Sequence, residues 1–132
     1  MLGLLSLQGM EGVMTVEGGT KKEVFITFLK TQVLPRLQPK DVLVMDNLKA
    51  HRAPGIQELV EETGAKVLYM PPYSPELNPI EPAWSKVKAL LRRWGLRDRE
   101  SLRDAIVEAA EHITVGDALG WFLHCGYRAP PN

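Results

Sequence analysis

Two short apolar runs, "DVLVMDN" at residues 41–47 and "AKVLYM" at residues 65–70, constrain the fold of this chain most. A short, continuous, β-branched run is typical of a strand with both faces covered, as in a parallel sheet. The segment between them, "APGIQELVEETG" at residues 53–64, is typical of a helix that ends at Gly64. Two strands joined by a helix form a right-handed parallel crossover, so the sequence predicts a βαβ unit here.

The chain before this unit predicts a hairpin and a helix. "LGLLSLQG" and "GVMTVEGG" are typical of strands, which gives a hairpin at residues 2–18 with its turn at Gln8–Gly12. Thr20 then opens a helix with Glu23 as the partner in a capping box, and Pro35 is the first of two prolines that close it.

The chain after the unit predicts three helices. The first runs from Asn78 to Gly95, the second covers residues 102–113 with Ser101 as its cap, and the last covers about 116–124. Their tryptophans fall on apolar stripes and are expected in the core: Trp84, Trp94 and Trp121. We expect one α/β domain over residues 1–132, with the hairpin followed by the parallel βαβ unit in one mixed sheet, flanked by helices.

Composition excludes some classes of protein. The formal net charge is zero, so only local charge can argue for a nucleic-acid partner. Cys125 is the single cysteine, which excludes an intramolecular disulfide and a cysteine metal cluster, and it is expected to be a small buried apolar residue. The first ten residues lack a signal-peptide pattern, and no run approaches the ~20 apolar residues that span a membrane. We expect a cytoplasmic protein.

Glu81 lies at an unusual place in "LYMPPYSPELNPIEPAWSKVK", residues 68–88, between Ile80 and Pro82. A structural interpretation is available: Asn78 is the N-cap and Glu81 completes a capping box at the positive end of the helix.

Asp46 adds a functional interpretation. It can form a turn with Asn47, but it also ends a buried strand, and open α/β sheets place their sites at the carboxyl ends of parallel strands. The Pro-rich loop leaves the neighbouring strand at that same end and leads to Glu81, so the two carboxylates are expected to face one point. Paired carboxylates suit a hard cation such as Mg²⁺ or Mn²⁺. The prolines would then hold Glu81 in place, and both interpretations of Glu81 can hold together.

The chain resembles a known family at these residues. "VLVMDNLKAH" and "YMPPYSPELNPIEPAWSKVK", with 34 residues between Asp46 and Glu81, resemble the DDE transposases of the IS630/Tc1/mariner superfamily, specifically the bacterial IS630-like branch. "FLHCGY" at residues 122–127 also resembles the end of such proteins.

The resemblance implies an RNase H-like fold and a site with two divalent metal ions, Mg²⁺ or Mn²⁺. It implies that Asp46 is the second catalytic acid, that Glu81 is the third, and that both bind metal. In the implied reaction, water cuts DNA at the transposon end and the freed 3′ hydroxyl attacks a TA target, without a covalent enzyme–DNA intermediate. The implied setting is an assembly of copies on paired DNA ends, in the nucleoid of a bacterial cytoplasm.

Further residues flank the expected site. Asn47 and His51 follow Asp46, and His51 either orients a phosphate or water or only supports its loop. Tyr73 and Ser74 precede Glu81 and either touch DNA or pack against the prolines, and Asn78 adjoins the site. Four basic residues of the long helix form an expected DNA-binding face, with a solvated surface as the alternative: Lys86, Lys88, Arg92 and Arg93.

The resemblance also implies a first strand that carries the first catalytic aspartate. This sequence begins with what is expected to be the second strand, and none of Glu11, Glu17, Glu23 and Asp41 stands in its place. We therefore expect an N-terminally truncated domain, inactive alone, whose missing strand comes from a partner chain or from residues 2–9 shifting inward. Two alternatives stay open: another RNase H-like nuclease such as a resolvase, or a non-catalytic remnant that binds DNA or a partner.

Overall fold

The computed structural model describes residues 2–15, 21–46, 54–72, 74–95 and 99–127. The chain divides into two compact units, residues 1–2 with 16–75, and residues 3–15 with 76–132.

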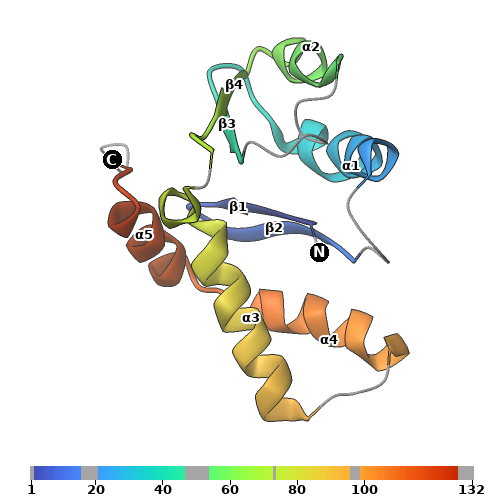
Figure 1. The fold of residues 1–132 in the computed structure, drawn as a ribbon, viewed down its shortest axis with the longest axis vertical. Helices are drawn as coiled ribbons and strands as arrows, with labels where there is room; N and C mark the ends of the chain where they lie inside the picture. The colour runs from blue at the N-terminus through green and yellow to red at the C-terminus, as the bar shows by residue number, and fades with distance from the viewer. Residues whose placement is uncertain (1, 16–20, 47–53, 73, 96–98, 128–132) are drawn as a thin grey trace. The chain divides into compact units, whose positions relative to one another are not determined.

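The first unit contains the parallel strand pair. β3 (Val42–Met45) pairs with β4 (Lys66–Tyr69) in parallel, with Val42 opposite Lys66 and Met45 opposite Tyr69. α2 (Ile56–Glu61) lies between the two strands in sequence and packs against β4 (Figure 1). The predicted βαβ unit is therefore confirmed, although α2 is shorter than expected at both ends. Gly64 follows it with φ +90, and a Cβ there would lie 3.0 Å from the Pro39 Cα, so both the backbone angle and the close approach favour glycine.

The first helix of this unit begins differently from the prediction and ends where it is predicted to end. α1 (Lys22–Phe28) has Lys21 as its N-cap, without a side-chain cap bond, so the expected capping box does not open it. Thr20 lies outside the described residues. The helical segment continues through the π-helix η1 (Leu29–Val33) and the 3₁₀ helix η2 (Leu34–Arg36), so it ends at the predicted closing prolines, although its second half is not α-helical. Pro35 is tolerated there because a first helical turn does not need its N–H.

The core of the first unit comes from α1, η1, β3, α2 and the residues that flank β4. The side chains that are almost fully buried belong to Phe25, Phe28, Leu29, Val33, Met45, Ile56, Val60, Ala65 and Met70. They include the predicted helix stripe, Met45 of β3, and Ala65 and Met70 on either side of β4. Val42 and Leu68 are more than half exposed, so the prediction that both strands are covered on both faces is wrong.

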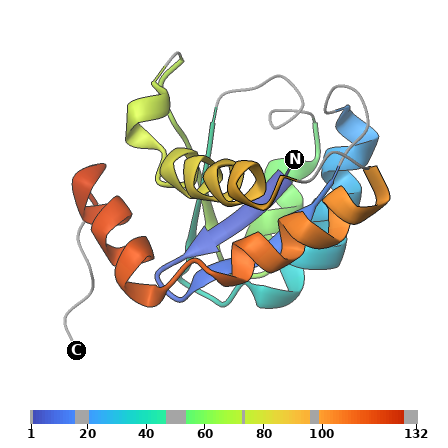
Figure 2. The same ribbon diagram turned by 90° about the horizontal axis from the view of Figure 1, so that it is seen from below.

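The second unit combines a hairpin with three helices. β1 (Leu2–Ser6) pairs with β2 (Gly9–Met14), and they precede α3 (Ile80–Trp94), α4 (Arg99–Glu111) and α5 (Val115–His124). α3 packs against α4, and β2 contacts both α4 and α5 (Figures 1 and 2). The mixed α/β class, with a hairpin and a parallel pair, is confirmed and is consistent with an RNase H-like fold. The single-domain expectation stays a prediction.

Two local predictions in this unit are wrong. The hairpin turn is Leu7–Gln8, not Gln8–Gly12, because the Ser6 hydroxyl accepts a bond from the Gln8 N–H and Gly9 takes φ +116 at the start of β2. Ser101 does not cap its helix, because α4 already begins at Arg99.

One apolar cluster holds the second unit together. Its buried members are Ala83, Val87, Ile106, Ala109 and Ile113. Trp84, Trp94 and Trp121 are half-buried and pack against it, which agrees with their predicted place in the core. Across the described residues, no helix has the length and apolar character needed to cross a membrane.

Candidate functional site

Asp46 follows the last residue of β3 and is half-buried. The parallel ladder fixes this end of the strand, because the Met70 N–H donates to the Met45 carbonyl at 2.8 Å. Asp46 therefore stands at the carboxyl end of a parallel strand, where the sequence places it and where α/β sheets carry their sites.

Glu81 stands on the first turn of α3, in the second unit. The Asn78 side-chain Oδ1 accepts from the Ile80 N–H at 3.2 Å, and the Asn78 carbonyl accepts from the Glu81 N–H at 3.1 Å. Pro79 and Pro82 fix two further φ angles on either side. The N-cap of α3 is Pro79 and not Asn78 as predicted, but Asn78, one residue earlier, binds both of these N–H groups and holds the backbone at Glu81.

The Glu81 carboxylate does not complete the expected capping box. Its side chain is exposed, and within the described ranges no hydrogen bond or ion pair reaches the carboxylate. Position near the positive helix end still favours its charge. Glu81 therefore combines a backbone held in place with a carboxylate that is open to solvent.

The residues expected near these acids are only partly described. Ser74 is half-buried, and its hydroxyl donates to the Pro72 carbonyl at 3.3 Å. Asn47, His51 and Tyr73 lie outside the described residues.

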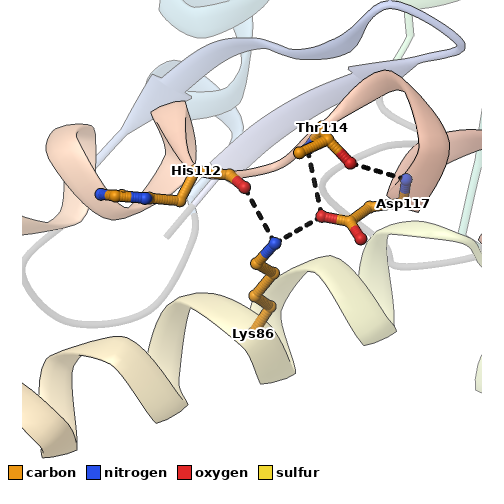
Figure 3. A network of polar contacts seen from close by, with 4 residues as sticks. All are labelled: Lys86, His112, Thr114 and Asp117. Atoms are coloured by element: carbon orange, nitrogen blue, oxygen red, sulfur yellow. Dashed lines mark hydrogen bonds and ion pairs between the residues drawn. The ribbon is translucent and has the colours of Figure 1, made fainter.

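Lys86 is bound within the second unit (Figure 3). Its Nζ donates to the His112 carbonyl at 2.8 Å and to the Asp117 carboxylate, so α3 is tied to the junction between α4 and α5. Asp117 and Thr114 also form a capping box at the start of α5, through bonds of 2.9 and 3.1 Å. The bond from Lys86 and the Thr114 N–H lower the pKa of Asp117.

This network was missed by the sequence analysis. The capping box was readable from the T-x-x-D pattern at 114–117, but the bond from Lys86 joins residues 31 positions apart and leaves no sequence signal. Because Lys86 already has two partners, a DNA-binding face on α3 depends mainly on the other three basic residues.

Those three residues, Lys88, Arg92 and Arg93, are exposed on α3. Lys88 and Arg92 are four apart and share one helix face. Arg92 and Arg93 also lie in the last turn, where positive charge favours the helix dipole, before Gly95 ends the helix with φ +69. Their exposure suits contact with phosphate, and their position also has this structural explanation.

The two acids suit a divalent cation by their chemistry, since both offer hard oxygen donors. Among the residues that the structure describes, no three His, Cys, Asp or Glu side chains gather as a metal-binding group. Cys125 is half-buried, and burial raises the pKa of its thiol, so a thiolate ligand is disfavoured.

These elements define a mixed α/β protein with one acid at the end of a parallel strand and another at the start of a helix. Residues 1–103 of the 132 match the family described as DDE superfamily endonuclease, so the chain belongs to that family. Membership implies a transposase-like nuclease that acts on DNA, in a family that typically uses divalent metals. The comparison with curated proteins found no match.

Proposed function

We propose that this domain is an IS630-like transposase domain of the IS630/Tc1/mariner superfamily, which cleaves DNA at transposon ends and joins them to a TA target. Asp46 and Glu81 are the carboxylates that hold its Mg²⁺ or Mn²⁺. The observation that carries the proposal is Glu81, whose backbone is fixed by Asn78 while its carboxylate is open.

The chemistry follows from the residues. When bound, a divalent cation supplies charge neutralisation at the reacting phosphate and activation of water. Glu81 contributes a negative charge at a fixed backbone position, and Asp46 contributes a second one at the end of β3. Lys88, Arg92 and Arg93 bind the phosphate backbone and orient the duplex.

The reaction test uses supercoiled plasmid with Mn²⁺ and an enzyme that also contains the first catalytic aspartate that the resemblance implies. In that enzyme Asp46→Asn and Glu81→Gln should each abolish cutting, because an amide lacks the charge that a hard cation needs. Glu76→Gln is the matched control, since Glu76 is an exposed acid in the short turn η4 (Pro75–Leu77). If Glu81→Gln cuts at the wild-type rate, Glu81 is not part of the catalytic site.

A second measurement separates transposition from simple cleavage. Pre-cut transposon ends incubated with a TA-containing target should give joined products in a transposase. Cleavage without joining would favour another RNase H-like nuclease, such as a resolvase. DNA binding without Mn²⁺ binding or cutting would favour a non-catalytic remnant.

A further inference from the structure

Tyr127 makes a long-range contact near the candidate acid. After α5, Gly126 turns the chain with φ +96, and the Tyr127 ring packs edge-on against Phe122 with centroids 5.9 Å apart. The Tyr127 hydroxyl then donates to the Leu77 carbonyl at 3.0 Å, across 50 positions of sequence. Burial raises the pKa of Tyr127, so the hydroxyl keeps the proton that it donates.

Leu77 belongs to the lead-in of Glu81. It is the last residue of η4, and Asn78 directly after it binds the N–H groups of Ile80 and Glu81. The proline φ angles at positions 79 and 82 leave this short stretch little freedom. A shift of the Leu77 carbonyl is therefore passed to the first turn of α3.

α5 and the residues after it hold α3 at one point and the segment before α3 at another. Asp117, in the first turn of α5, binds Lys86, and Tyr127, beyond its end, binds Leu77. Glu81 lies between these two points along the chain. Both anchors come from residues beyond the family match, which ends at 103.

We propose that Tyr127 is a positioning residue that fixes the backbone of Glu81 for binding a divalent cation. This inference rests on the proposed function of Glu81. It follows from the open carboxylate, because a side chain without bonds among the described residues is placed by its backbone alone. Metal sites need their ligands held within a few tenths of an ångström, so a loosened backbone at Glu81 lowers the affinity for the cation.

The test measures Mn²⁺ affinity of the full chain by electron paramagnetic resonance, together with hydrogen exchange at the Glu81 amide. Tyr127→Phe removes the hydroxyl and keeps the ring that contacts Phe122. Glu81→Gln and the double variant Tyr127→Phe with Glu81→Gln complete a double-mutant cycle. Cys125→Ala is the control, because it alters the same segment and leaves the hydroxyl in place.

In Tyr127→Phe we expect the hydrogen of the Glu81 amide to exchange with solvent faster than in wild type. We also expect this variant to bind Mn²⁺ about tenfold more weakly, as is found when other groups that support metal ligands are removed. Its thermal midpoint should stay close to wild type, and Cys125→Ala should match wild type in both readouts. In the Glu81→Gln background, Tyr127→Phe should add no further loss of affinity. A purely structural role would lower affinity equally in both backgrounds.

The outcomes separate the two claims. If Glu81→Gln weakens Mn²⁺ binding and Tyr127→Phe does not, the positioning role is wrong and the proposed function stands. An unchanged exchange rate at the Glu81 amide in Tyr127→Phe also overturns the positioning role. If Glu81→Gln binds Mn²⁺ as wild type does, or if the wild-type chain binds none, both the proposed function and the positioning role of Tyr127 are wrong.

Discussion

At the scale of single residues, Gly3 has no room for a side chain. A Cβ there would lie 2.6 Å from Trp84 Cζ2 and 3.2 Å from Ile80 Cδ1, both atoms of the packed second unit. Gly3→Ala should lower the free energy of unfolding by about 1–3 kcal/mol, because the indole ring must move out of a packed position. Urea denaturation measures this loss.

Gly120 provides the opposite case on the exposed side of α5. A Cβ there meets no atom within 4 Å, and glycine inside a helix costs up to about 1 kcal/mol relative to alanine. Gly120→Ala should therefore raise the free energy of unfolding. Equal effects of the two substitutions would show that Gly3 is not closely packed against Trp84.

Asp117 makes stability depend on pH. Its pKa is lowered in the folded chain, so its ion pair with Lys86 stabilises the fold above the unfolded pKa of about 4 and stops doing so as pH falls through the lowered value. Asp117→Asn keeps an acceptor for the Thr114 N–H and loses the charge. Between pH 5 and 7 the variant should be less stable than wild type by at most about 1 kcal/mol, since both side chains are about one-third exposed.

Urea denaturation at pH 7, 5 and 3 checks the sign of this effect. The difference between wild type and Asp117→Asn should begin to shrink below about pH 4, where the carboxyl of the unfolded chain takes up its proton, and should be lost as pH falls through the lowered pKa of the folded chain. A difference that stays the same at all three values would mean that capping, and not the ion pair, carries the contribution of Asp117.

At the scale of elements, α3 shows what a sequence pattern can and cannot reveal. Its predicted range, Asn78 to Gly95, agrees closely with the observed Ile80–Trp94, because capping and helix-ending residues act locally. The start of α4 was misplaced, since Ser101 is an equally good cap that the helix bypasses. The partners of Lys86 and Tyr127 could not be predicted, because they depend on tertiary packing between distant residues.

The exposed face of α3 predicts a salt-dependent interaction. Lys88→Ala combined with Arg92→Ala should weaken DNA binding and reduce the slope of log affinity against log salt by about one for each lost phosphate contact. Lys22→Ala with Arg36→Ala removes the same charge from exposed positions in the first unit and serves as the control.

Fluorescence anisotropy at several salt concentrations distinguishes these pairs. Because overall charge changes equally in both, only local contact can make the α3 pair differ. If the slope of log affinity against log salt is the same for both double variants, Lys88 and Arg92 are solvated surface residues that do not contact DNA.

At the scale of the whole molecule, the chain passes between its two units three times, after residues 2, 15 and 75. Separate domains are usually joined by one exposed linker with few contacts. Here residues 3–15 group with 76–132, so neither unit is a continuous stretch of chain. The family match also ends inside the second unit, at residue 103. We therefore propose that residues 1–132 are a single domain that unfolds as a whole.

Val60 and Val87 test this proposal, because each is fully buried and they belong to different units. Val60→Ala and Val87→Ala should each lower the free energy of unfolding by roughly 2 kcal/mol through lost burial and a residual cavity. In all-or-none unfolding, the slowest-exchanging amides of β4 and α3 open together, so each substitution should speed exchange equally in both elements. Val107→Ala, on the exposed side of α4, should change neither element. If Val60→Ala speeds exchange in β4 and leaves α3 at its wild-type rate, the units unfold separately, because a local opening does not alter the free energy of the other unit.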